Sequence, residues 1–170
     1  MSKRNKYYDS YSPLYNGNIS AMSVNIGKLN APLLYNYQYD QLNRIVAMDA
    51  FTGLNESNNT WNPLTTDNSY QERLSYDANG NIKSYLRNGT GATFNLNNYN
   101  YTYQSGSNRL LSIQNSVNNQ TSNYDYDAIG NVIKDDKQNV TFNNWNVYGK
   151  LQSTQKLDGT NITYPLLAQE

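Results

Sequence analysis

The sequence contains no cysteine and no histidine in its 170 residues. Without cysteine, the chain has no disulfide, no thiolate metal ligand and no thiol nucleophile. The absence of histidine removes the commonest general base and the commonest metal ligand in proteins. We therefore expect that the protein is not an enzyme and that it uses no cofactor or metal.

The chain also has no excess of charge, because 13 Lys and Arg residues balance 13 Asp and Glu residues. A neutral chain lacks the basic field that attracts nucleic acid or an anionic membrane surface. No apolar run approaches the roughly 18 residues of a membrane-spanning helix. The charged start, "MSKRNK", is not followed by the apolar region of a signal peptide. The sequence thus predicts neither a nucleic-acid partner nor a membrane span.

Tyrosine and asparagine are abundant instead, with 17 and 30 residues respectively. Tyrosine favours strands, whereas asparagine and glycine favour turns. No segment places apolar residues at the spacing of an amphipathic helix. The composition therefore predicts an all-β chain with many turns.

One pattern, Tyr-Asp-x-x-Gly-Asn-aliphatic, recurs along the chain. The best copies are "YDANGNI" and "YDYDAIGNV", and weaker copies begin near residues 14, 35, 100 and 142. Asp at the first position and Gly at the fourth are typical of a type I turn, and a left-handed residue after such a turn makes a bulged hairpin. Asn43 and Asn108 stand where Gly is expected, and Asn tolerates the left-handed region. We assign structural turn roles to Asp40, Asn43, Asp77, Gly80, Asp127, Gly130 and Gly149.

The repeats divide the chain into three parts. Residues 1–13 form an N-terminal lead-in, residues 14–155 carry the hairpin repeats, and residues 156–170 form a C-terminal tail. Within the repeats, residues 51–69 are predicted to be a long loop. Because a single hairpin is only marginally stable, we expect the hairpins to build one curved, open antiparallel sheet. Its open edges would favour self-association.

The tandem motif resembles the YD repeat of the RHS (rearrangement hotspot) family over roughly residues 14–154. The resemblance implies an arc of the β-sheet shell that these proteins build, with the structural function of enclosing or presenting a partner polypeptide. It also implies a secreted or cell-surface location. The implied partners are other shell segments or a C-terminal toxin or cargo polypeptide. The Asp-Pro dipeptide of the family's autocleavage region is missing from this sequence.

Other interpretations of the same residues are open. The turn aspartates could bind Ca²⁺, but a calcium loop needs several closely spaced oxygen ligands, so turn capping is favoured. The aromatic residues could stack on sugars, which would make the chain an extracellular carbohydrate-binding or adhesion module. Trp61, in the predicted loop, is the candidate ligand-facing aromatic. Arg44, Arg109 and Lys150 recur at the start of the return strand, where we predict pairing with an acidic or tyrosine partner.

Overall fold

The computed structural model describes residues 13–27, 31–58, 60–63 and 68–165. The described residues form 13 strands that pair antiparallel in an open sheet, and they include the single-turn 3-10 helices η2 (Gly91–Thr93) and η3 (Asp136–Gln138). The predicted all-β chain and its open antiparallel sheet are therefore confirmed. The predicted arc of a larger shell stays a prediction, and the lead-in of residues 1–13 lies outside the described residues except for its last one.

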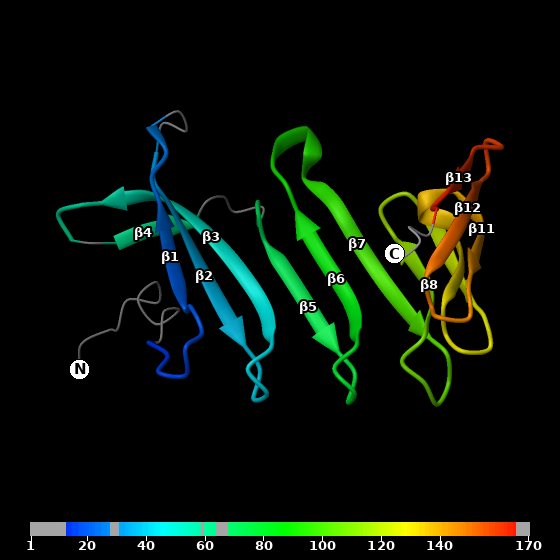
Figure 1. The fold of residues 1–170 in the computed structure, drawn as a ribbon. Coiled ribbons are helices and arrows are strands. Elements are labelled where there is room, and N and C mark those ends of the chain that lie inside the picture. The colour runs from blue at the N-terminus through cyan, green and yellow to red at the C-terminus, as the bar shows by residue number, and fades with distance from the viewer. Residues whose placement is uncertain (1–12, 28–30, 59, 64–67, 166–170) are drawn as a thin grey trace. The chain divides into compact units, whose positions relative to one another are not determined.

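The chain divides into two compact units, residues 1–98 and 99–170. In the first unit, neighbouring strands follow the order β1, β2, β3, β5 and β6, and β4 pairs with the far end of β3 (Figure 1). These strands are β1 (Ala21–Val24), β2 (Leu33–Tyr39), β3 (Ile45–Asn55), β4 (Thr60–Pro63), β5 (Glu72–Tyr76) and β6 (Ile82–Asn88).

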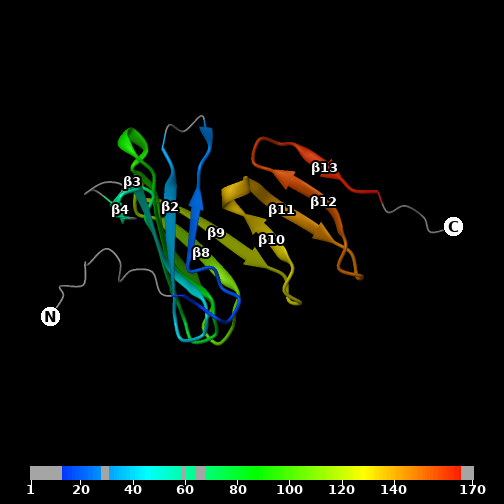
Figure 2. The same ribbon diagram turned by 90° about the vertical axis from the view of Figure 1, so that its left-hand side faces the viewer.

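Strand β7 (Asn95–Tyr103) begins in the first unit and continues into the second. From there each strand of the second unit pairs with the next one along the chain (Figure 2). These strands are β8 (Leu110–Asn115), β9 (Gln120–Tyr126), β10 (Val132–Asp135), β11 (Val140–Trp145), β12 (Leu151–Lys156) and β13 (Asn161–Thr163).

Two segments differ from the sequence prediction. The predicted loop of residues 51–69 contains the last part of β3 and all of β4, because a short turn after Asn55 folds β4 back onto β3. The Asn55 side chain stabilises that turn by accepting the Ser57 N–H at 3.1 Å. The predicted tail of residues 156–170 contains β13, which a turn at Gly159 folds back onto β12. Residues 64–67 and 166–170 lie outside the described residues.

The repeat turns share one hydrogen-bonded geometry. In the turn that begins at Asp77, the Asp77 N–H donates to the Asn81 carbonyl at 2.9 Å, and the Gly80 N–H donates back to the Asp77 carbonyl at 3.1 Å. The same two bonds close the turns that begin at Asp40, Asp127, Asn146 and Lys156. The fourth residue of each turn has a left-handed backbone, with φ of 61° at Asn43, 89° at Gly80, 101° at Gly130, 69° at Gly149 and 85° at Gly159.

The turn between β7 and β8 is one residue longer and corrects one expectation. Its left-handed residue is Gly106, with φ of 74°, and Asn108 is not among the residues of positive φ. Glycine enters the left-handed region at no steric cost, so Gly106 is the left-handed residue here. It is the third residue of its turn, and the Ser107 N–H donates to the Gln104 carbonyl at 3.1 Å.

Strand alternation gives the first unit a tyrosine face, on which most side chains are half-buried. Opposite Tyr37 of β2 lies Met48 of β3, and opposite Leu74 of β5 lies Tyr85 of β6. We define the tyrosine face as Tyr35, Tyr37, Tyr39, Met48, Leu74, Tyr76 and Tyr85. Among the described residues of the whole chain, the buried apolar side chains are Ala47, Met48 and Ala50, all on β3. Burial in a core is thus a minor part of what holds these strands together.

The left-handed position gives a test at Gly149, where an added Cβ would meet no atom within 4 Å. Gly149→Ala should lower the free energy of unfolding by about 1 kcal/mol, because alanine resists the left-handed region. Gly149→Asn should cost less, since asparagine already occupies this position at residue 43. Urea denaturation of both variants measures the difference. Equal losses would contradict this account of the turn.

Candidate functional site: the linked turns

The turn aspartates are caps whose oxygens are occupied by the turn itself. One Asp127 oxygen accepts the N–H groups of Ile129, Gly130 and Asn131 at 2.8 to 3.0 Å, and the other accepts the Asn131 side chain at 2.8 Å. Asp77 and Asp40 make the corresponding bonds, with Asn81 and Arg44 as their side-chain donors.

Hydrogen bonds also set the charge state of these caps. The Arg44 backbone N–H lowers the pKa of Asp40, although burial acts in the opposite direction. The Asn81 side chain lowers the pKa of Asp77 in the same way. At Asp127, burial raises the pKa, but the Asn131 side chain and the turn N–H groups outweigh it and leave a net lowering. All three carboxylates are therefore charged at neutral pH.

Three hairpins are linked to the one before by an aromatic side chain that precedes the turn. The Tyr76 hydroxyl donates to the Ile45 carbonyl at 2.7 Å, and the Tyr39 hydroxyl donates to the Ile19 carbonyl at 2.8 Å. In the second unit the Trp145 indole N–H donates to the Val132 carbonyl at 2.9 Å. In each case the acceptor is the first aliphatic residue after the preceding turn. We call these contacts, together with the turns that they join, the linked turns.

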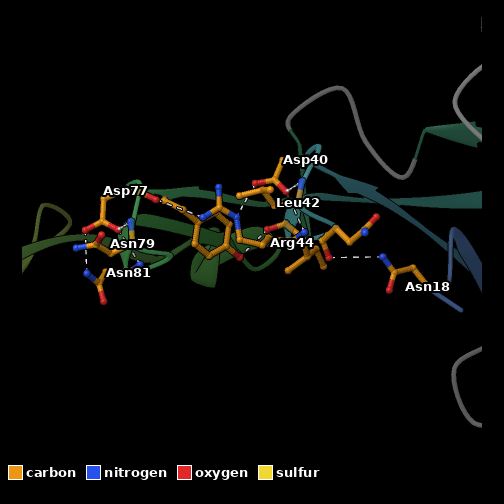
Figure 3. Close-up of polar contacts among 10 residues, drawn as sticks. Asn18, Asp40, Leu42, Arg44, Asp77, Asn79 and Asn81 are labelled. Atoms are coloured by element: carbon orange, nitrogen blue, oxygen red, sulfur yellow. Dashed lines mark hydrogen bonds and ion pairs between the residues drawn. The ribbon is translucent and has the colours of Figure 1, made fainter. Parts of the chain in front are cut away.

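Arg44 strengthens the link between the second and third turns (Figure 3). Its Nε donates to Asp40 at 2.7 Å within its own turn, and its Nη1 donates to the Asp77 carbonyl of the next turn at 3.3 Å. The guanidinium carbon lies 4.5 Å from the centre of the Tyr76 ring, a favourable cation–π distance. One side chain therefore contacts the cap, the backbone and the aromatic ring of two successive hairpins.

Other neighbouring turns use similar contacts. The Arg109 guanidinium carbon lies 5.8 Å from the centre of the Tyr126 ring, on the following hairpin. In the first unit, the Asn16 side chain donates to the Asn43 side chain at 2.6 Å. The predicted pairing with a tyrosine or acidic partner is confirmed for Arg44 and Arg109. For Lys150 it stays a prediction, and the Lys150 backbone N–H donates to the Asn146 side chain at 3.0 Å.

Trp61 does not lie in a loop. It is a half-buried residue of β4, so the prediction of a loop position for this aromatic is wrong. The most exposed aromatic side chains of the described residues are Tyr15 and Tyr148, which are 95% and 83% exposed. Their position in the repeat turns is a signal of exposure that the sequence analysis did not use, because turn residues usually lie at the surface.

The described residues contain no group of three or more acidic side chains that could hold a metal ion. Their helices are too short and too polar to cross a membrane. Asp135 caps η3 by accepting the Gln138 N–H at 3.1 Å, and Asp136 accepts the side chain of Asn123, in the middle of β9, at 2.8 Å. The arrangement of the linked turns is thus suited to holding hairpins in register.

A search of known protein-family models finds none that matches this chain, and a search of curated proteins finds no match either.

The aromatic link predicts a loss of stability in Tyr76→Phe. This change removes the hydroxyl that donates to Ile45 and keeps the ring under Arg44. The free energy of unfolding should fall by about 1 kcal/mol, as for a typical hydrogen bond. Tyr35→Phe, on the same face, is the matched control and should be close to neutral. Urea denaturation compares them, and equal effects would argue against the link.

The charged caps predict a loss of stability in acid. Because the folded pKa of Asp127 lies below its unfolded value of about 3.9, its contribution is present above that pH and is lost as the pH falls through the folded pKa. Asp127→Asn keeps an oxygen acceptor, as Asn146 does naturally. The variant should therefore lose less stability than the wild type between about pH 7 and about pH 3. Urea midpoints at the two pH values test this, and an unchanged drop would refute it.

Proposed function

We propose that this chain is a structural segment of an RHS-type repeat protein whose sheet encloses or presents a partner polypeptide. The observation that supports this function best is the linked turn, which recurs from hairpin to hairpin with the same donor and acceptor positions. Hairpins joined in this way can be added one after another, as an extended enclosing layer requires. The cap carboxylates are occupied by the turns, which favours a structural role over catalysis.

The tyrosine face is the surface that we propose for contact with the partner polypeptide. Tyrosine combines a large apolar ring with a polar hydroxyl, so it can contact varied sequences at little conformational cost. The charged pair beside it, Glu72 and Arg87, is balanced, with 3.5 Å between Oε1 and Nε. The face therefore selects neither acidic nor basic segments.

The partners in this proposal are other shell segments or a C-terminal toxin or cargo polypeptide. The chain would act outside the cell or at its surface, and the open edges of the sheet would allow self-association. No catalytic step is part of the proposal.

An adhesion module that binds carbohydrate is the alternative function. The exposed rings of Tyr15 and Tyr148 favour it, because a sugar can stack on an open aromatic face. The half-buried position of Trp61 gives it no support.

The two functions predict different binding. The wild-type chain should bind reduced, carboxymethylated lactalbumin, a permanently unfolded polypeptide, and Tyr37→Ser should weaken this binding by about tenfold. Gln38→Ser changes the adjacent residue on the opposite face and should leave binding unchanged. Fluorescence anisotropy measures both, after circular dichroism has shown that the variants fold.

Equal loss in both variants, or no binding by the wild type, would contradict the proposal. Binding on a glycan array that Tyr148→Ser abolishes would favour the adhesion module instead.

A further inference from the structure

We propose that two copies of this chain pair through the outer edge of β13, in antiparallel register about a two-fold axis at Ile162. Among the described residues, β13 pairs with β12 alone, and all three of its residues are exposed. The pairing does not rest on the proposed enclosing role, because it follows from the backbone and side chains of one edge strand.

The backbone of β13 determines which residues could form the hydrogen-bonded pairs with a second copy. The Thr160 carbonyl accepts the Lys156 N–H at 2.8 Å, and the Tyr164 N–H donates to the Gln152 carbonyl at 2.8 Å. Even-numbered residues of this segment therefore direct their polar groups toward β12. Because these groups alternate along a strand, the N–H and C=O of Asn161 and Thr163 face outward.

A two-fold axis at Ile162 places Asn161 of one copy opposite Thr163 of the other. These two residues are the ones with outward polar groups, so each Asn161–Thr163 pair can exchange two hydrogen bonds. Ile162 then faces its own counterpart in the non-hydrogen-bonded position, where Cα atoms lie about 4.5 Å apart and side chains are closest. With the opposite parity, Ile162 would instead face its counterpart as a hydrogen-bonded pair, whose Cα atoms lie about 5.5 Å apart.

The side chains of the edge also suit a second copy. Charge and proline are the usual devices that protect an edge strand from pairing, and residues 160–164, "TNITY", carry neither. Pro165 follows directly, outside the two hydrogen-bonded pairs proposed here. Thr, Ile and Tyr favour strands. Ile162 and Tyr164 lie on one face and are 37% and 43% exposed, so the pairing would bring apolar side chains of both copies together. A charged partner has nothing to recognise here, whereas a copy of the same segment fits.

An added strand would stabilise the second unit more than it would stabilise a domain with a well-packed apolar core. None of its described apolar side chains is buried, since the three buried ones all lie on β3 of the first unit. Pairing at β13 extends the unit's sheet from its outer edge and covers part of the exposed apolar surface. The symmetric contact closes after two copies, because each copy uses its β13 edge once.

Cysteine cross-linking tests the register directly, because the wild-type chain has no cysteine. In Ile162→Cys the Cα atoms of the two cysteines would lie about 4.5 Å apart, which is within the range of a disulfide. In Asn161→Cys the two cysteines would be diagonal neighbours whose Cα atoms lie about 7–8 Å apart, which is beyond that range. Under mild oxidation, non-reducing gels should show the cross-linked dimer as the main product for residue 162 and only traces for residue 161.

Light scattering after size exclusion gives the second measurement. The wild type should show a concentration-dependent dimer, which Ile162→Lys should abolish by placing two like charges face to face. Ile129→Lys, at an exposed turn in the same unit, is the matched control and should dimerise as the wild type does. A monomeric wild type, equal cross-linking at residues 161 and 162, or larger oligomers that Ile162→Lys leaves intact would each overturn the proposal.

Discussion

The register of the repeat hairpins whose turns begin at Asp40, Asp77, Asp127 and Asn146 depends on the ring of hydrogen bonds inside each turn. A slip of one residue would move every side chain to the other face of the sheet, so the pairing must be fixed somewhere. Here the cap, the left-handed residue and the two backbone bonds fix it at the turn. One extra residue on the return strand follows, such as Lys83 opposite the gap between Ser75 and Tyr76. The aromatic residue before the turn then lies beside the first aliphatic residue that follows the turn of the preceding hairpin. The link forms between these two residues, as between Tyr76 and Ile45.

The acceptor in each link is a main-chain carbonyl, which explains why imperfect copies of the repeat can still form the link. Any residue supplies a carbonyl, so the chain constrains only the donor, which must be aromatic and carry a polar hydrogen. Trp145 meets this requirement with an indole N–H where other copies have a tyrosine hydroxyl. Asn146 likewise replaces the capping aspartate, because its side-chain oxygen accepts the same two N–H groups that Asp40 accepts in its turn. The hydrogen-bonding role of each position is thus kept from copy to copy, although the residue type changes.

The sequence was sufficient for the parts of the fold that are encoded locally. The turn motif and the alternating tyrosines predict the hairpins, because both signals act within about ten residues. It was insufficient between β3 and β4, where no strong turn motif marks the turn after Asn55. It was also insufficient where two nearby residues could each adopt the left-handed conformation, as with Gly106 and Asn108. The links between hairpins were also invisible, since Tyr76 and Ile45 meet only after the register of two separate hairpins has been set.

The position of these links at one end of the hairpins has a consequence for how such a chain can change in evolution. The three aromatic links all lie at the ends of the hairpins that carry the repeat turns. The connections at the other end range from the short turn between β8 and β9 to the β4 excursion between β3 and β5. Insertions there leave the linked end undisturbed. Duplication of a repeat that has such a link would also preserve the link, because the repeat carries the aromatic donor before its turn and an acceptor carbonyl after it. The length of the sheet can therefore change by whole repeats without any compensating mutation.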